Sequence, residues 1–181
     1  MRAFVAIRLP APLREELAGY AAGAVTGLDG RALPAANLHV TVHFLGAVED
    51  ADADPLLDAL RAVCAAGAPF ALRVAEAALA PPSRPRMIWA RLEAPEALAG
   101  LARAVASAAE PFAPRARPPR TGKPHVTLAR LRRPPRRGTK LPPLAAAGAE
   151  VAVDGVALVR SELGRGGARY TTLGELPLGG G

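Results

Sequence analysis

Two segments of this chain repeat one tripeptide in matching surroundings. Residues 37–46 read NLHVTVHFLG and residues 124–131 read PHVTLARL, so His-Val-Thr occurs twice, 86 residues apart. In both segments apolar residues alternate with His and Thr, a period of two that is typical of a half-buried β-strand. The repeated strand favours a fold of two similar sheets, each carrying one His-x-Thr segment.

Chance does not readily produce this repetition. The chain has seven threonines among 181 residues and only three histidines. A threonine would follow a given histidine by two positions in about 4% of cases, so two such pairs among three histidines have a chance of roughly half a percent. The repetition therefore indicates a shared role for the two tripeptides.

Hydrophobic periodicity predicts the remaining elements. We expect strands at 2–9, 39–45, 70–80, 87–92, 125–131, 150–160 and 168–176. We expect helices at 10–22, 50–66 and 95–110. Residues 111–124 and 132–143 form Pro/Arg-rich loops, and 161–167 form a Gly-rich turn. The pattern predicts an α+β fold of one domain, 1–181, with two similar lobes, each an antiparallel sheet backed by helices, and an active-site cleft between the lobes.

The charge of the chain leaves its partner open. The net charge is +7, and 21 of the 23 basic residues are arginines, which suit a polyanion such as RNA. The codon usage of a GC-rich genome would give the same excess. Cys64 is the only cysteine, which excludes an intramolecular disulfide and a cysteine metal cluster. No apolar run is long enough to suggest a membrane span, so we expect a soluble, cytoplasmic protein.

The paired tripeptides suit acid–base chemistry at phosphorus. Alternation puts His39 and Thr41 on one face of their strand, and His125 and Thr127 on one face of theirs. If the strands face each other, a neutral imidazole can take a proton from an attacking hydroxyl while a protonated one gives a proton to the leaving oxygen. The threonine hydroxyls can donate hydrogen bonds to phosphoryl oxygens. No metal is needed for this reaction.

Other interpretations exist for single residues. A strand histidine taken alone is more often a surface or core residue, and a strand threonine reflects β propensity. His43 shares the alternation face of His39 but has no counterpart at Ala129, so we expect it at the rim or surface. His39 and His43 do not resemble a zinc pair of the H-E-x-x-H kind, which needs a helix and a glutamate where Val40 stands.

The arginines near the second tripeptide are harder to place. Arg130 is one residue off the alternation of His125 and Thr127, so it faces away from them unless strand twist or a bulge at Leu131 redirects it. Six further cations lie on loops near the proposed site and form either a phosphate track or solvated loops: Arg84, Arg86, Arg115, Arg117, Arg120 and Lys123.

Five segments in order carry a family pattern: RAFVAIRLP at 2–10, NLHVTVHFLG at 37–46, PRMIWA at 85–90, PHVTLAR at 124–130 and VALVRSELGRGGARY at 156–170. Together they resemble the RNA 2′,3′-cyclic phosphodiesterases, also called 2′-5′ RNA ligases, of the two-histidine phosphoesterase superfamily. The resemblance covers nearly the whole chain and is more specific than either tripeptide alone.

The resemblance implies an activity and roles for five residues. It implies metal-independent hydrolysis of an RNA-terminal 2′,3′-cyclic phosphate to a 2′-phosphate, with reversible, ATP-independent 2′-5′ joining of RNA ends in some members. His39 matches the proton donor and His125 the proton acceptor, while Thr41, Thr127 and Arg130 match phosphate-binding residues. It implies no metal and no cofactor. The expected partner is RNA with a cyclic phosphate end, tRNA-derived RNA included, and the expected state is a monomer.

Three competing functions remain open from the residues. A non-catalytic RNA-binding module could keep the same face, although binding alone does not require a matched acid and base. A metallohydrolase would lose activity in a chelator. The same chemistry could also act on small nucleotide cyclic phosphates.

Overall fold

The computed structural model describes residues 1–119, 122–164 and 167–179. Within these residues nine strands form one antiparallel sheet in the order β7-β4-β5-β6-β3-β1-β8-β9, and β2 pairs with β6 off this path. The strands are β1 Arg2–Arg8, β2 Gly30–Ala32, β3 His39–Ala47, β4 Phe70–Ala80, β5 Met87–Glu93, β6 His125–Leu131, β7 Glu150–Val153, β8 Gly155–Gly164 and β9 Gly167–Pro177. The helices are α1 Ala11–Ala24, α2 Ala53–Ala65 and α3 Glu96–Ala109, with short 3-10 turns η1 Ala35–Asn37 and η2 Asp50–Asp52.

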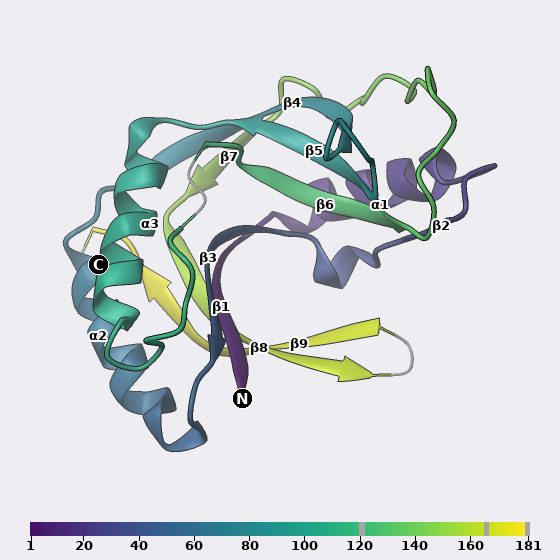
Figure 1. The fold of residues 1–181 in the computed structure, drawn as a ribbon. Helices are drawn as coiled ribbons and strands as arrows, with labels where there is room; N and C mark the ends of the chain where they lie inside the picture. Colours follow the sequence, from purple (N-terminus) through teal and green to yellow (C-terminus); the bar gives the residue numbers. More distant parts are fainter. Residues whose placement is uncertain (120–121, 165–166, 180–181) are drawn as a thin grey trace.

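Apart from β2, which pairs with β6, the strands of the sheet divide into two groups of four. The two groups can be followed in Figure 1. One group is β7-β4-β5-β6 and the other is β3-β1-β8-β9, and each contains one His-Val-Thr strand. Between β3 and β6 the described pairing is a single residue pair, Val40 with Val126. The predicted α+β fold with two antiparallel groups is confirmed. The two groups are, however, connected as one curled sheet.

The two groups are not the two halves of the sequence. Strand β1 pairs with β8 near the other end of the chain, whereas β7 pairs with β4. The strand predicted at 150–160 is therefore two strands, because the chain bends at Asp154 and passes from one group to the other. Of the predicted turn at 161–167, residues 161–164 continue β8, and 165–166 lie outside the described residues. The three-residue β2 was not predicted.

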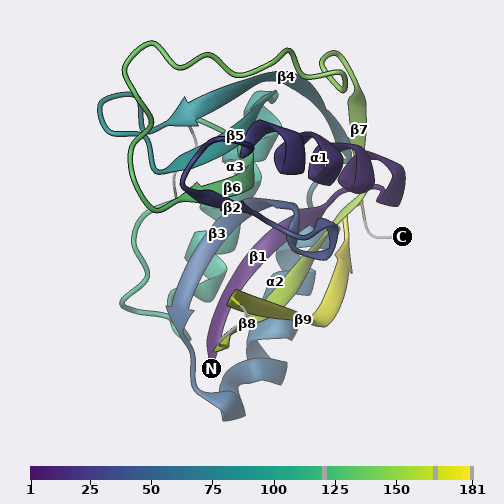
Figure 2. The ribbon, with the colours of Figure 1, turned by 90° about the vertical axis from the view of Figure 1, so that its right-hand side faces the viewer.

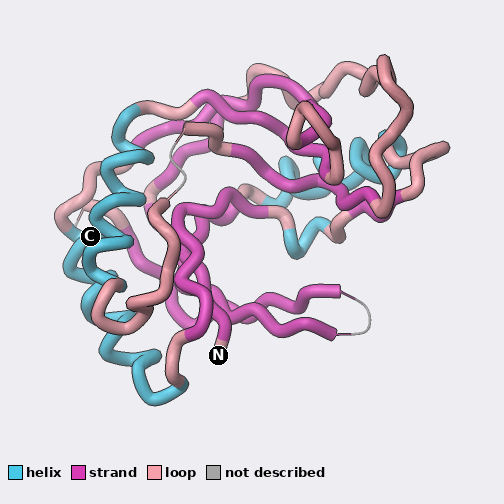
Figure 3. The backbone as a smooth tube through the Cα atoms, viewed as in Figure 1, coloured by secondary structure: helices cyan, strands magenta, loops and turns pink. Residues whose placement is uncertain are grey.

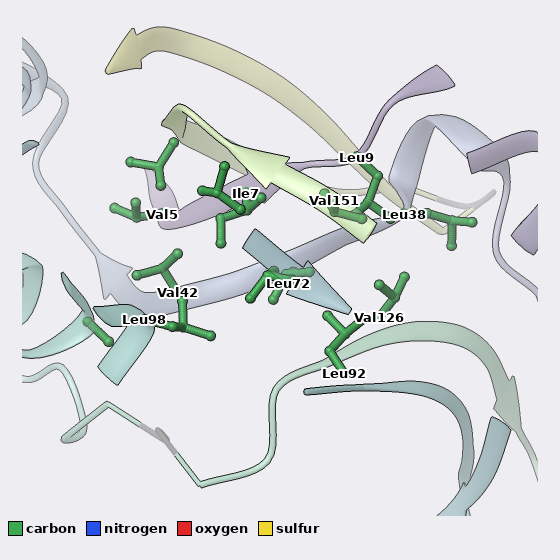
Figure 4. Close-up of a cluster of buried hydrophobic side chains, with 14 of the residues drawn as sticks. Val5, Ile7, Leu9, Leu38, Val42, Leu72, Leu92, Leu98, Val126 and Val151 are labelled. Carbon is green, nitrogen blue, oxygen red and sulfur yellow. The ribbon is translucent and has the colours of Figure 1, made fainter. Parts of the chain in front are cut away.

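The helices cover the sheet from different sides. Helix α1 packs against β2 and β6 (Figure 2), while α2 and α3 pack against each other and against β9 and β3 respectively (Figure 3). One apolar cluster extends through both strand groups (Figure 4). It includes Val5 and Val42 from one group and Leu72, Val126 and Val151 from the other. The shared core fixes the two groups relative to each other at the β3–β6 junction.

Strand β1 is buried on both faces. Its side chains Val5 and Ile7 enter the main core, while Phe4 and Ala6 form a second cluster with residues of β8, against which Tyr170 of β9 packs. This second cluster lies on the face of the sheet opposite the main core, because successive side chains of a strand point to opposite faces. It borders the His39 side of the candidate site.

Candidate active site

The two tripeptides meet at the junction of the strand groups. Val40 and Val126, the central residues of the tripeptides, pair with each other across the antiparallel strands β3 and β6. A local twofold axis therefore relates one tripeptide to the other. Both valines are fully buried, so the histidines and threonines on either side of them point to the opposite face of the sheet. The sequence predicted that these four side chains converge, and the pairing brings their strands together.

The two imidazoles are held by equivalent backbone contacts. His39 Nδ1 lies 2.8 Å from the carbonyl oxygen of Asn37, and His125 Nδ1 lies 2.8 Å from that of Lys123. A carbonyl only accepts, so Nδ1 carries a proton in both rings and Nε2 is the atom left for chemistry. Nε2 of His39 lies 3.2 Å from Oγ1 of Thr41, whose hydroxyl donates to the neutral ring. Each ring is thus oriented with Nε2 as its proton-transfer atom.

A bulge follows each tripeptide. In the β1–β3 pairing Val5 lies opposite His43 and Ala6 opposite Thr41, which leaves Val42 as an extra residue. In the β5–β6 pairing Ile88 lies opposite Ala129 and Trp89 opposite Thr127, which leaves Leu128 extra. An extra residue in one strand shifts its alternation by one position. The burial patterns of the first seven residues of β3 and β6 are accordingly identical.

The bulge at Leu128 brings Arg130 to the face of His125 and Thr127. Arg130 is exposed, whereas Ala129 before it is buried. We predicted a site-facing Arg130 only if twist or a bulge at Leu131 redirected it, and the bulge lies three residues earlier. Phe44 occupies the equivalent position in β3, is 65% exposed and contacts Phe4 at 5.8 Å between ring centroids. Strict alternation from Val40 would put Phe44 on the core face, and the bulge at Val42 reverses this.

The expectation for His43 was wrong. His43 is 4% exposed and occupies the position equivalent to Ala129. The bulge at Val42 turns it into the core, away from the face of His39 and Thr41. Burial lowers the pKa of His43 because the charged ring loses water. The same geometry opposes a zinc site built on His39 and His43, since the two rings lie on opposite faces of β3.

His39 lies among aromatic rings. Phe4 of β1 packs on it with ring centroids 4.8 Å apart, and Tyr170 of β9 meets it edge-on at 5.3 Å. Burial lowers the pKa of His39; the hydrogen bond to Asn37 opposes this, and the positive charges of His125 and Arg130 lower the pKa further. These charge effects place His39, His125 and Arg130 near one another. Three groups that can carry positive charge therefore lie close together at the junction of the strand groups.

His125 has a different neighbour. Its ring stacks on the indole of Trp89 in β5, with centroids 3.7 Å apart and the planes inclined by 16°. Its cross-strand partner in β5 is Arg91, whose guanidinium is paired with Glu76 at 2.9 Å. The two histidines thus share a backbone frame but not a side-chain environment.

Comparisons with known proteins identify the family of the chain. The family model described as the 2′-5′ RNA ligase superfamily matches residues 10–165. The chain belongs to this superfamily. The protein TT0787 of Thermus thermophilus is 32% identical over 99% of both chains, with a TM-score of 0.86. E. coli LigT, solved with 3′-AMP, is 30% identical over 98% of this chain and 97% of its own, with a TM-score of 0.79. No curated protein sequence matches the chain.

Membership of the 2′-5′ RNA ligase superfamily establishes the broad activity. The protein is an enzyme of the RNA ligase and phosphodiesterase type, with the curled antiparallel fold of LigT. Usb1 of Kluyveromyces marxianus, 13% identical with a TM-score of 0.54, shares the fold. None of the described helices has the length and apolar character to cross a membrane.

The loop cations near the site of this RNA ligase homologue lie at the surface where the structure describes them. The loop cations Arg84, Arg86, Arg115, Arg117 and Lys123 are exposed, and Arg120 lies outside the described residues. Among the described residues no three His, Cys, Asp or Glu side chains are grouped to hold a metal ion. Two hollows of about 250 and 230 Å³ lie around Ala94 and Pro95, and no histidine lines either of them.

Proposed function

We propose that this enzyme opens RNA-terminal 2′,3′-cyclic phosphates to 2′-phosphates, using His39 as proton donor and His125 as proton acceptor. The observation that carries the proposal is the Val40–Val126 pairing, which sets two equivalently oriented imidazoles on one face of one sheet. Structures of LigT with phosphate and with 3′-AMP support a phosphate-binding site in a protein of the same fold.

The proposed reaction is an in-line displacement at phosphorus. Water attacks the phosphorus atom while Nε2 of His125 takes its proton, and the P–O3′ bond breaks as Nε2–H of His39 protonates O3′. Thr41, Thr127 and Arg130 hold the phosphoryl oxygens and oppose the charge that develops on them. The products are a 2′-phosphate and a free 3′-hydroxyl. With a 5′-hydroxyl of RNA as attacker, the same steps give a 2′-5′ linkage.

Hydrolysis should dominate over joining. Opening the strained five-membered ring with water is downhill, whereas exchange of one ester for another is closer to balanced and reverses readily. The proposed donor must be charged to act, although burial and nearby cations lower the pKa of His39. The negative charge of the bound phosphate opposes these cations and favours the protonated ring. Substrate binding and protonation of His39 are therefore coupled.

We propose that residues 1–181 act as a single unit and as a monomer. Strand β1 at one end of the chain and strands β8 and β9 at the other belong to the same strand group, so neither end can be removed without opening that group. The core cluster also joins both groups.

The direct test uses an RNA oligomer that ends in a 2′,3′-cyclic phosphate, incubated with the protein and EDTA. We expect full activity, because the proposed acid, base and phosphate ligands are all side chains of the protein. The product phosphate should map to the 2′ position. Loss of activity that only added zinc or manganese restores would contradict the metal-independent mechanism. RNA that is bound but not turned over would indicate the non-catalytic alternative.

Salt should weaken RNA binding. Each phosphate contact on a single strand contributes about 0.7 to the slope of log affinity against log salt. Replacing the exposed loop residues Arg115 and Arg117 by Gln should flatten the slope by about 1.4 if both contact phosphates. The matched control replaces Arg61 and Arg103, which are paired with Asp58 and Glu96 on the helices. Binding that does not change with salt would mean that the positive charge reflects composition alone.

Nucleoside 2′,3′-cyclic phosphates test the small-molecule alternative in the same assay. An RNA enzyme should have a higher kcat/KM for the oligomer, because only the oligomer offers backbone phosphates to the loops. Equal values would favour the small-molecule alternative.

A further inference from the structure

The local twofold axis allows the two strand groups to be compared position by position. The order of the strands on either side of the β3–β6 junction makes β5 the equivalent of β1. Trp89 lies opposite Thr127, and Ala6 lies opposite Thr41, so Trp89 and Ala6 are equivalent positions. The strand pairing is the same at the two positions, but one carries a large indole and the other a methyl group.

The indole of Trp89 makes a face-to-face contact that has no counterpart at His39. It stacks on the His125 ring at 3.7 Å with a 16° inclination, whereas the neighbours of His39 are tilted by 30° or edge-on. A flat indole face attracts a cation that lies over it, and a protonated imidazole is such a cation. The stack should therefore both restrict the ring and favour its charged form.

The position of Trp89 is not explained by hydrogen bonding. Its Nε1 is buried and has no partner among the described residues. A buried N–H without a partner is unfavourable, so the contacts of the indole face must outweigh this cost. The stack on His125 is one such contact, and it is made at the proposed proton acceptor.

We propose that Trp89 is a positioning residue that holds the His125 ring for proton transfer and stabilises its protonated form by stacking. In this way the indole gives His125 a stacked neighbour that His39, held by the equivalent backbone contact, does not have. The effect on catalysis rests on the proposed function, in which His125 accepts a proton from the attacking water. The effect on the ring itself does not depend on that function.

Charged groups near the stack are part of the argument. Arg130 on β6 and His125 both lower the pKa of His39 on β3 through their charge, so these three groups lie near one another. Arg91 on β5 lies opposite His125 and is paired with Glu76 on β4. These groups stay unchanged in a Trp89 variant, so a change in the titration of His125 reports the loss of the indole.

The test compares Trp89→Phe with Trp89→Leu. Phenylalanine keeps a flat ring without the unpartnered N–H, whereas leucine is apolar but not flat. NMR titration of the free protein should show the His125 midpoint lowered by about half a pH unit in Trp89→Leu and largely restored in Trp89→Phe. His39 serves as the internal control. An unchanged His125 midpoint in Trp89→Leu would overturn the proposal, whether or not the protein hydrolyses cyclic phosphates.

Kinetics test the positioning role. Trp89→Leu should lower kcat on the order of tenfold, since misplacement of a catalytic group slows the step it performs. The acid limb of its pH profile should move to lower pH with the His125 midpoint. In a His125→Ala background the same substitution should change the rate less than about twofold, because its effect passes through the missing ring. An equal loss in both backgrounds would mean a structural role and would overturn the proposal. If thermal unfolding shows that Trp89→Leu does not fold, Trp89→Met replaces it in each measurement.

Discussion

Alanine at His39 or at His125 should slow the opening of a 2′,3′-cyclic phosphate by roughly 10²–10⁴-fold, the usual contribution of one positioned proton transfer. Substrate binding should largely survive, because Thr41, Thr127 and Arg130 remain to hold the phosphate. The double variant should lose less than the product of the two single losses, since both rings act in one step. Single-turnover rates and substrate affinity measure these effects separately.

The leaving group identifies which ring is the acid. An aryl phosphodiester with a nitrophenolate leaving group needs no proton on departure. It should restore most of the lost rate in His39→Ala and little in His125→Ala. Rescue of His125→Ala instead would reverse the two roles, and full activity in both single variants would refute the two-histidine mechanism.

The third histidine supplies a matched control. His43 is buried on the opposite face of β3, so His43→Gln should lower the melting temperature without removing the proton transfer. Its kcat/KM, measured where the variant is folded, should stay within a few-fold of the native enzyme. A rate loss as large as that of His39→Ala would contradict the placement of His43 outside the site.

Local patterns were sufficient for most of the helices and strands of the fold. Alternation over 39–45 and 125–131 identified β3 and β6, and the burial of the valines follows from it directly. The pairing of these strands is a contact between residues 86 positions apart, which no local pattern determines. The repeated tripeptide and the family resemblance suggested that the two strands face each other across a cleft, but not that they pair within one sheet. Periodicity also predicted β7 and β8 as a single strand. The chain bends at Asp154 because β7 pairs with β4 and β8 pairs with β1, and the side-chain pattern carries no information on these partners.

The bulges limited the prediction of the site. Strict alternation continued past Val42 and Leu128 puts the residues directly after them on the wrong face. This one effect accounts for the burial of His43, the exposure of Phe44 and the approach of Arg130 to the site. The two bulges occupy equivalent positions, so the same structural cause explains the misplaced residues in both strands. The sequence around Phe44 and Arg130 contains no local signal that the alternation shifts at the bulges.

The bulge at Leu128 gives Arg130 two expected effects: it binds the phosphate, and its charge lowers the pKa of His39. Arg130→Gln should lower kcat/KM by roughly 10–150-fold, the equivalent of losing a hydrogen bond assisted by charge. It also removes one of the positive charges that lower the pKa of His39, so that pKa should rise toward its usual value. As proton donor, His39 must be protonated in the free enzyme. The alkaline limb of the kcat/KM profile, which reports the loss of that proton, should therefore move to higher pH than in the native enzyme.

Arg130→Lys separates the two effects. Lysine keeps the charge but not the planar fork that binds two phosphoryl oxygens. We expect a loss of kcat/KM with the alkaline limb left where it is in the native enzyme. Arg103→Gln, which removes a distant cation paired with Glu96, should change neither the rate nor the limb. If the limb of Arg130→Gln coincides with that of the native enzyme, the Arg130 charge does not act on His39. The bulge would then have brought the arginine to the phosphate without linking it to the proton donor.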